Sequence, residues 1–149
     1  MSTRALIKVF EGNTKICTIY KQSDGYPEGL GAELHRYLSE FTVGNGITGN
    51  EKEPYANGMG CLTAQIIARL KVEPGEIYII VGNDATVDYV YEIGKGAVRT
   101  TYGPFNKIGY GLIMKVLDGN GNDAPVLFNG AVGEFGEYLE NRKKEQEYE

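Results

Sequence analysis

The sequence predicts an α+β fold: a mostly antiparallel sheet of about six strands, with two or three helices packed on one face. Two β-rich runs at the N-terminus are joined by a glycine-containing turn. Two stretches with apolar residues at helical spacing follow. Most of the remaining chain then alternates short β-rich runs with glycine- and asparagine-rich turns. Strands, then helices, then a run of hairpins favour one α+β domain that spans 1–149.

The N-terminal hairpin is expected from residues 5–10 and 15–20, around a two-residue turn at Gly12 and Asn13. This turn places Glu11 opposite Thr14 and Arg4 opposite Lys21. One face of the hairpin would then be mostly apolar and the other would carry four basic residues: Arg4, Lys8, Lys15 and Lys21. Such a face suits an anion, or long side chains that lie over a half-covered sheet.

Helices are expected at about 30–41, after the glycine-rich loop 44–58, and at 131–145. The loop 44–58 is interpreted as a lid or a connector. Residues 76–81 are apolar on both faces and predict a central strand. Residues 87–93 and 97–102 predict a hairpin around Gly94-Lys95-Gly96, and 112–117 and 126–128 predict further strands.

The stretch 19–30 concentrates polar and aromatic residues where a strand turns into a helix. Asp24-Gly25 is a strong turn dipeptide, and Pro27 fixes its own φ. The expected hairpin register brings the following candidate ligand-binding residues to one surface, with loop 44–58 able to close over it: Arg4, Tyr20, Lys21, Asp24, Tyr26 and Glu28. The alternative is a purely structural corner, since corners need Gly, Pro and Asp anyway.

Composition excludes several classes of protein. The formal net charge is −5, which argues against a groove for a nucleic-acid duplex, because such grooves are basic. The sequence has no apolar run long enough for a membrane span and no signal peptide. Cys17 and Cys61 have no paired spacing, and we expect two buried, reduced thiols in a cytoplasmic protein.

Catalytic and metal-binding motifs are weak. His35 is the only histidine, there is no G-x-S-x-G, and one histidine with two scattered cysteines does not predict zinc. The loop 118–123 departs from a calcium loop at its glycine and at its final glutamate. Residues 57–60 open a helix with N–H groups that suit a phosphate, but they lack a phosphate-binding signature. We therefore expect no catalytic residues, no metal and no cofactor.

A resemblance comes from the opening Met1-Ser2-Thr3-Arg4-Ala5-Leu6-Ile7 and the block Ser-Asp-Gly-Tyr-Pro-Glu-Gly-Leu-Gly at 23–31. Together they resemble a group of small, mostly uncharacterised bacteriophage and mobile-element proteins, over about the first forty residues. Many members have a histidine just before this block, where Lys21-Gln22 stands here, so histidine chemistry is not carried over. The resemblance implies a phage-type accessory protein in the cytoplasm of a host cell.

The expected function is binding rather than catalysis, with a small anionic or nucleotide-like ligand or a host protein as partner and with possible homo-oligomers. The most specific hypothesis is anti-defence: sequestration of a nucleotide-derived host-defence signal without turnover. Two alternatives stay open. One is a small hydrolase that uses Asp24 and Glu28 as an acid–base pair, and the other is a protein–protein interaction module.

Overall fold

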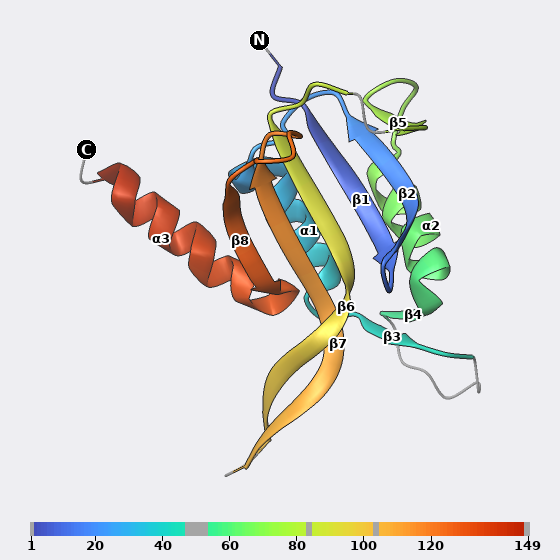
Figure 1. The fold of residues 1–149 in the computed structure, drawn as a ribbon, viewed down its shortest axis with the longest axis vertical. Helices are drawn as coiled ribbons and strands as arrows, with labels where there is room; N and C mark the ends of the chain where they lie inside the picture. The colour runs from blue at the N-terminus through green and yellow to red at the C-terminus, as the bar shows by residue number, and fades with distance from the viewer. Residues whose placement is uncertain (1, 47–53, 83–84, 103–104, 148–149) are drawn as a thin grey trace.

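A six-stranded sheet organises the chain, in the order β5-β2-β1-β6-β7-β8 (Figure 1). The computed structural model describes residues 2–46, 54–82, 85–102 and 105–147. The sheet strands are β1 (Ala5–Glu11), β2 (Thr14–Lys21), β5 (Ile77–Ile80), β6 (Tyr89–Tyr102), β7 (Phe105–Asp118) and β8 (Val126–Ala131). The β1–β6 pair is parallel and the other neighbouring pairs are antiparallel. The predicted α+β fold is therefore confirmed.

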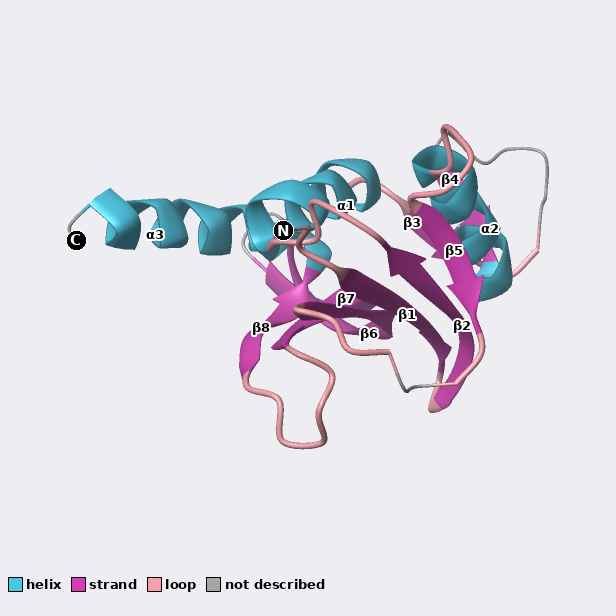
Figure 2. Cartoon of the chain, turned by 90° about the horizontal axis from the view of Figure 1, so that it is seen from above, coloured by secondary structure: helices cyan, strands magenta, loops and turns pink. Residues whose placement is uncertain are grey.

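The helices pack on one face of the sheet. They are α1 (Ala32–Leu38), α2 (Gly58–Leu70) and α3 (Phe135–Glu147), with a short turn at Pro27–Gly31 before α1 and another at Val132–Glu134 before α3. Figure 2 shows α1 and α2 over the sheet and α3 extending beyond the edge formed by β8. The main core lies between sheet and helices and contains Ile7, Ile19, Leu34, Leu62 and Ile66, each almost fully buried.

The β1–β2 hairpin has the predicted turn but not the predicted register. Glu11 pairs with Thr14, and a bulge between Val9 and Phe10 then shifts the pairing, so that Ala5 rather than Arg4 lies opposite Lys21. The extra residue is on β2, and a one-residue slip moves the rest of that strand to the opposite face. The expected basic face is therefore wrong for β2: Cys17 and Ile19 pack into the main core beside Ala5, Ile7 and Val9.

The corner between β2 and α1 depends on close backbone packing. A Cβ added to Gly25 would lie 2.6 Å from the Cβ of Ala5, and one added to Gly31 would lie 2.9 Å from the ring of Phe135. The helix predicted at 30–41 starts earlier, with a π-helical turn at Pro27–Gly31, and α1 ends at Leu38.

Tyr91 holds this corner from the middle of the sheet. Its side chain is fully buried on β6, and its hydroxyl donates a hydrogen bond of 2.7 Å to the carbonyl of Gly25. Burial raises the pKa of Tyr91 far above its ordinary value, so the hydroxyl remains a donor at every ordinary pH.

Strand β5 forms an edge of the sheet, so its predicted central position is wrong. Ile77 is buried, but Ile79 is 64% exposed and Tyr78 is 45% exposed. An apolar run on both faces is expected of a central strand, yet here a single neighbour, β2, pairs with it. The apolar pattern of residues 76–81 does not indicate that β5 pairs with only one strand.

The predicted hairpin around Gly94-Lys95-Gly96 is also wrong. Strand β6 runs straight through these glycines and pairs with β7 at every position from Tyr89 to Tyr102. Glycine at position 96 leaves room for the side chain of Ile113, because an added Cβ would lie 2.8 Å from Cδ1 of Ile113. Glycine in a strand interior often marks such a close approach rather than a turn. The far part of this β6–β7 ribbon extends beyond the other strands (Figure 1).

A small parallel pair, β3 (Thr42–Gly44) and β4 (Tyr55–Asn57), leads into α2. The middle of the predicted loop 44–58, at 47–53, lies outside the described residues. Cys17 is half-buried, but Cys61 is exposed, so the expectation of two buried thiols is wrong for Cys61. In the described part of the chain, every helix is too short or too polar to cross a lipid bilayer.

We expect Tyr91→Phe to lower the free energy of unfolding by about 1–2 kcal/mol, because it leaves the buried Gly25 carbonyl without its donor. Tyr89→Phe is the matched control, since Tyr89 lies two residues away on the same face of β6 and is only partly buried. Urea denaturation of both variants measures the difference. Equal losses of stability in the two variants would contradict the role given to this hydrogen bond.

Candidate functional site

The six predicted ligand-binding residues lie at one end of the sheet, but two of their charges are already engaged. The Nζ of Lys21 lies 3.1 Å from Oε1 of Glu76, which also accepts hydrogen bonds from the backbone and hydroxyl of Ser23. Glu28 accepts a 2.8 Å ion-paired hydrogen bond from Nε of Arg142 on α3. These pairs join the corner to β5 and to the C-terminal helix.

The other four predicted residues point in different directions. Tyr20 lies on the opposite face of the sheet from Lys21 and packs against Tyr78, with ring centroids 6.0 Å apart. Arg4 is held through its backbone, whose N–H donates to a carboxylate oxygen of Asp88 at 3.0 Å. The expected convergence of six side chains is therefore wrong, because it depended on the hairpin register that the bulge changes.

Asp24 and Tyr26 are exposed, and Asp24 has a clear structural role. Its φ of 56° lies in the left-handed region, and its carbonyl accepts a 3.0 Å hydrogen bond from the N–H of Leu30. This bond fits the interpretation of Asp24 as a turn residue. Tyr26 lines a hollow of about 460 Å³ together with two carboxylate residues, Asp88 and Asp118.

The described ends of the loop 44–58 lie away from the predicted surface. Lys95 of β6 donates to the carbonyl of Val43 on β3, whereas Tyr89 of β6 pairs with Ala5. Six residues of extended strand separate these points by about 20 Å. The residues that would close over the predicted surface, 47–53, lie outside the described part of the chain.

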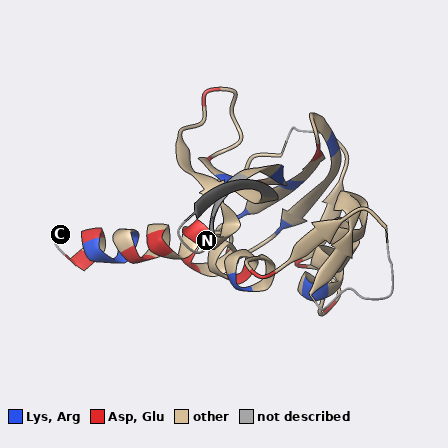
Figure 3. Cartoon of the chain, turned by 90° about the horizontal axis from the view of Figure 1, so that it is seen from below, with Lys and Arg blue, Asp and Glu red and all other residues tan. Residues whose placement is uncertain are grey.

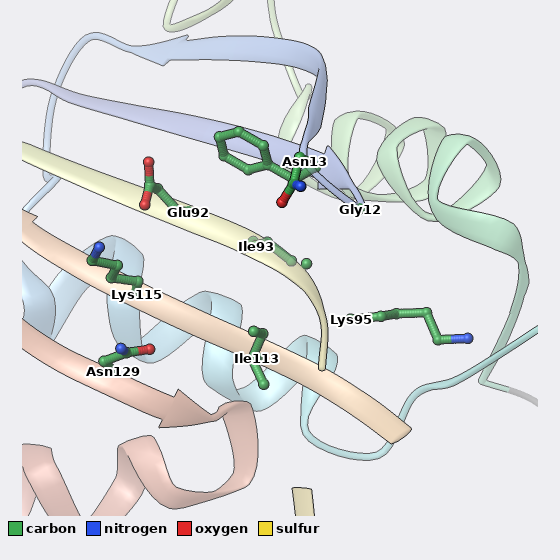
Figure 4. Close-up of a pocket in the computed structure, with 10 residues that line it drawn as sticks. Gly12, Asn13, Glu92, Ile93, Lys95, Ile113, Lys115 and Asn129 are labelled. Carbon is green, nitrogen blue, oxygen red and sulfur yellow. The ribbon is translucent and has the colours of Figure 1, made fainter. Parts of the chain in front are cut away.

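A different cluster forms on the outer face of the sheet, the face opposite α1 and α2. One residue from each of four adjacent strands lies in register across this face: Lys8 with Glu92, Glu92 with Lys115, and Lys115 with Asn129. We call these four residues the outer row. Figure 4 shows three of its members, Glu92, Lys115 and Asn129, on neighbouring strands.

Lys8 carries a destabilised positive charge. Partial burial lowers its pKa below the ordinary lysine value, and the charge of Lys15 lowers that pKa further, while Glu92 opposes the shift. Its Nζ donates to Oδ1 of Asn120 at 2.9 Å, and Nδ2 of Asn120 donates to the carbonyl of Ala85. The loop after β7 is thereby attached to Lys8, the member of the outer row on β1.

Glu92 and Lys115 face each other across β6 and β7 without an ion pair. In the part of the chain that the structure describes, neither side chain has a hydrogen bond or salt bridge. Their donors and acceptors are thus available to a ligand. Figure 3 shows basic positions on neighbouring strands of the sheet and both acidic and basic positions on α3.

Two hollows meet at the outer row. One, of about 580 Å³, is lined mainly by polar residues that include Lys8, Asn120 and Asn122. The other, of about 320 Å³, has an apolar floor that includes Phe10 and Ile113, with Asn13 and Asn129 at its side (Figure 4). Glu92 and Lys115 line both hollows. Together they form a groove with one polar half and one more apolar half.

The sequence contains a signal for this groove in the positions of its charged strand residues. Lys8, Glu92 and Lys115 each stand in the middle of a β-rich run, and each has a buried neighbour on both sides. Because successive side chains of a strand point to opposite faces, a charged residue between two buried neighbours points away from the core. The sequence could place each residue on an outer face, but it could not align the three strands.

The whole chain was compared with protein-family models, curated proteins and solved structures, and no match was found in any of them. Function therefore has to follow from the chemistry of the groove and of its neighbours.

We expect Glu76→Gln to remove an acid-dependent part of the stability. Hydrogen bonds from Ser23 and the charge of Lys21 lower the pKa of Glu76, so this stabilisation is present above the ordinary glutamate pKa of about 4.3 and is lost as the pH falls through the lower folded-state value. Melting temperatures measured from pH 7 to pH 3 should fall more steeply for the native protein than for the variant. Parallel curves would contradict this role; Glu73→Gln, at an exposed position, is the control.

Proposed function

We propose that the protein binds a small anionic ligand in the groove on the outer face of the sheet, and that it does so without turnover. The single observation that carries this proposal is the outer row, where Lys8 and Lys115 flank one carboxylate, Glu92, beside two hollows. Lys15 adds a further positive charge near Lys8. An anion would offset the repulsion between Lys8 and Lys15, and this effect favours binding.

A nucleotide-derived ligand suits the groove better than a simple anion. Binding sites usually combine an apolar surface with a few polar groups that fix orientation. The half with Phe10 and Ile113 offers the apolar surface, and the half with Lys8 and Asn120 offers the polar groups. The resemblance to phage proteins suggests the physiological version of the proposal, which is sequestration of a nucleotide-derived host-defence signal in the host cytoplasm.

Binding is favoured over hydrolysis by the positions of the expected acid–base pair. Glu28 is engaged by Arg142, and Asp24 lies in a left-handed turn that its own carbonyl stabilises. A general acid–base pair needs two carboxyl groups on either side of a bound substrate. Asp24 does not line the groove, and neither does Glu28.

A second candidate, a protein-binding module, is supported by the edge strand β5. Residues 77–82 carry no charge, and Ile79 and Val81 are 64% and 101% exposed. Edge strands of soluble proteins are usually protected by charge, proline or a covering segment. Addition of a strand from a host protein or from a second copy would cover this edge.

Incubation with a panel of ribonucleotides, including cyclic forms, separates the candidates. We expect a thermal shift with at least one compound and recovery of that compound unchanged after the protein is denatured. An altered compound would indicate an enzyme instead. If no compound shifts the melting temperature while a protein partner is retained, the interaction-module proposal replaces this one.

We expect Lys115→Ala to weaken binding of any compound found in this way by about tenfold or more, because a hydrogen bond to a charged group contributes about 1.5–3 kcal/mol. Lys143→Ala is the matched control, since Lys143 is exposed on α3 and the change in net charge is the same. Titration calorimetry at constant salt measures both affinities. Equal affinities in the two variants would place the ligand elsewhere.

A further inference from the structure

We infer that the groove takes a ribonucleotide in one orientation, with the phosphate beside Lys8 and Asn120, the ribose over Glu92, and the base in the hollow beside Phe10. This inference rests on the proposed function and adds the chemical class of the ligand and the role of each part of the site.

The phosphate end follows from the distribution of donors. The Nζ of Lys8 lies at this end of the groove. It uses one of its three N–H bonds to donate to Asn120, so the others can donate to a phosphate. Asn122 lines the same hollow and carries an amide group that can donate hydrogen bonds, while Asn120 holds Lys8 in place. A phosphate here would also offset the repulsion between Lys8 and Lys15. The other hollow has a more apolar floor, where a phosphate would lose solvation against Phe10 and Ile113.

The sugar position follows from Glu92. Its carboxylate lies between Lys8 and Lys115 in the outer row and lines both hollows. A carboxylate repels a phosphate but accepts hydrogen bonds from hydroxyl groups, and acidic residues bind the ribose hydroxyls of dinucleotides in this way. Glu92 has no hydrogen bond among the described residues, so both of its oxygens can accept from the 2′- and 3′-hydroxyls. Glu92 therefore separates the two ends of the ligand.

The base end follows from the apolar floor. Phe10 and Ile113 line this hollow on either side of Gly94, which has no side chain to fill the space between them. A Cβ added to Gly94 would lie at an ordinary contact distance, 3.8 Å, from the Cβ of Phe10, so the glycine leaves room for a small group beside Phe10. Aromatic side chains provide stacking surfaces for bases of every kind. The amides of Asn13 and Asn129 can donate to and accept from the edge of the base.

The spacing along the strands is compatible with this order. Lys8 and Phe10 are two residues apart on β1, which corresponds to about 7 Å, and they point to the same face. Glu92 on the adjacent strand is in register with Lys8, and Gly94 follows it by the same step. The step from phosphate to sugar therefore runs across the strands from Lys8 to Glu92, and the step from sugar to base runs along the strands towards Gly94 and Phe10.

The decisive experiment measures affinities by titration calorimetry for five kinds of probe: ribonucleoside 5′-monophosphates, their 2′-deoxy counterparts, the free nucleosides, ribose 5-phosphate and inorganic phosphate. We expect the native protein to prefer a ribonucleotide over its 2′-deoxy counterpart by about tenfold, which corresponds to the loss of one hydrogen bond to a charged group. Glu92→Gln should reduce this preference, and Glu137→Gln on α3, a neutralisation at an exposed position, should leave it unchanged.

Two further variants separate the ends of the ligand. Phe10→Ala should weaken nucleotides more than ribose 5-phosphate, and Lys8→Met should weaken nucleotides more than free nucleosides. Each comparison is made between two ligands on one folded protein, so a general loss of stability does not mimic it. Melting curves confirm that each variant is folded.

The outcomes distinguish the two proposals. Equal affinity for ribo- and deoxyribonucleotides, together with no effect of Glu92→Gln, would overturn the orientation while the anion site remained. A failure of every anionic probe, phosphate and ribose 5-phosphate included, would overturn the proposed function itself.

Discussion

The buried hydrogen bond from Tyr91 to the carbonyl of Gly25 is the constraint on which the arrangement of sheet and helices depends. It links the centre of β6 to the corner between β2 and α1, 66 residues earlier in the chain. The carbonyl can reach Tyr91 because Gly25 lies against Ala5 and Gly31 lies against Phe135 and Tyr91, at distances that leave no room for a Cβ. Four segments that are distant in the sequence thus meet around this hydrogen bond. A buried carbonyl without a donor would cost about 1–3 kcal/mol.

The same constraint gives a physical account of the block at 23–31. Ser23 donates to Glu76, Asp24 adopts a left-handed turn, and Gly29 approaches the carbonyl of Asp24 so closely that an added Cβ would lie 2.6 Å from it. These requirements concern backbone space and turn geometry. In this chain the block therefore forms a structural corner, and the proposed ligand chemistry has to come from another surface.

Local patterns were sufficient for the type of most elements but not for their neighbours. The Gly12-Asn13 turn, the second helix and the C-terminal helix followed from turn chemistry and periodicity. The bulge opposite Val9 could not be read from the sequence, although it reverses the faces of half a strand. The glycines at 94 and 96 carried a turn signal, yet the close approach of Ile113 explains glycine at 96 equally well. The expected convergence of the six candidate residues was wrong for the same reason, because it depended on the register of the hairpin. The outer row could not be predicted either, because it depends on the alignment of four strands, which only the fold supplies.

The outer row also gives a physical reason why the proposed binding surface lies opposite the helices. The helix-covered face must exclude charge, since an unpaired charge buried there would be very costly, and so Lys8, Glu92 and Lys115 all leave it. On the outer face the cost is smaller but still present, because Lys8 remains partly buried and close to another lysine. A sheet selected for stability alone would gain by replacing one of these lysines or by pairing Lys115 with Glu92. The pKa of Lys8 is lowered by this burial and by the charge of Lys15, and groups with perturbed pKa values concentrate at functional sites. An anion bound as proposed would add negative charge beside these lysines, and this complementarity connects the constraints of the fold to the proposed activity.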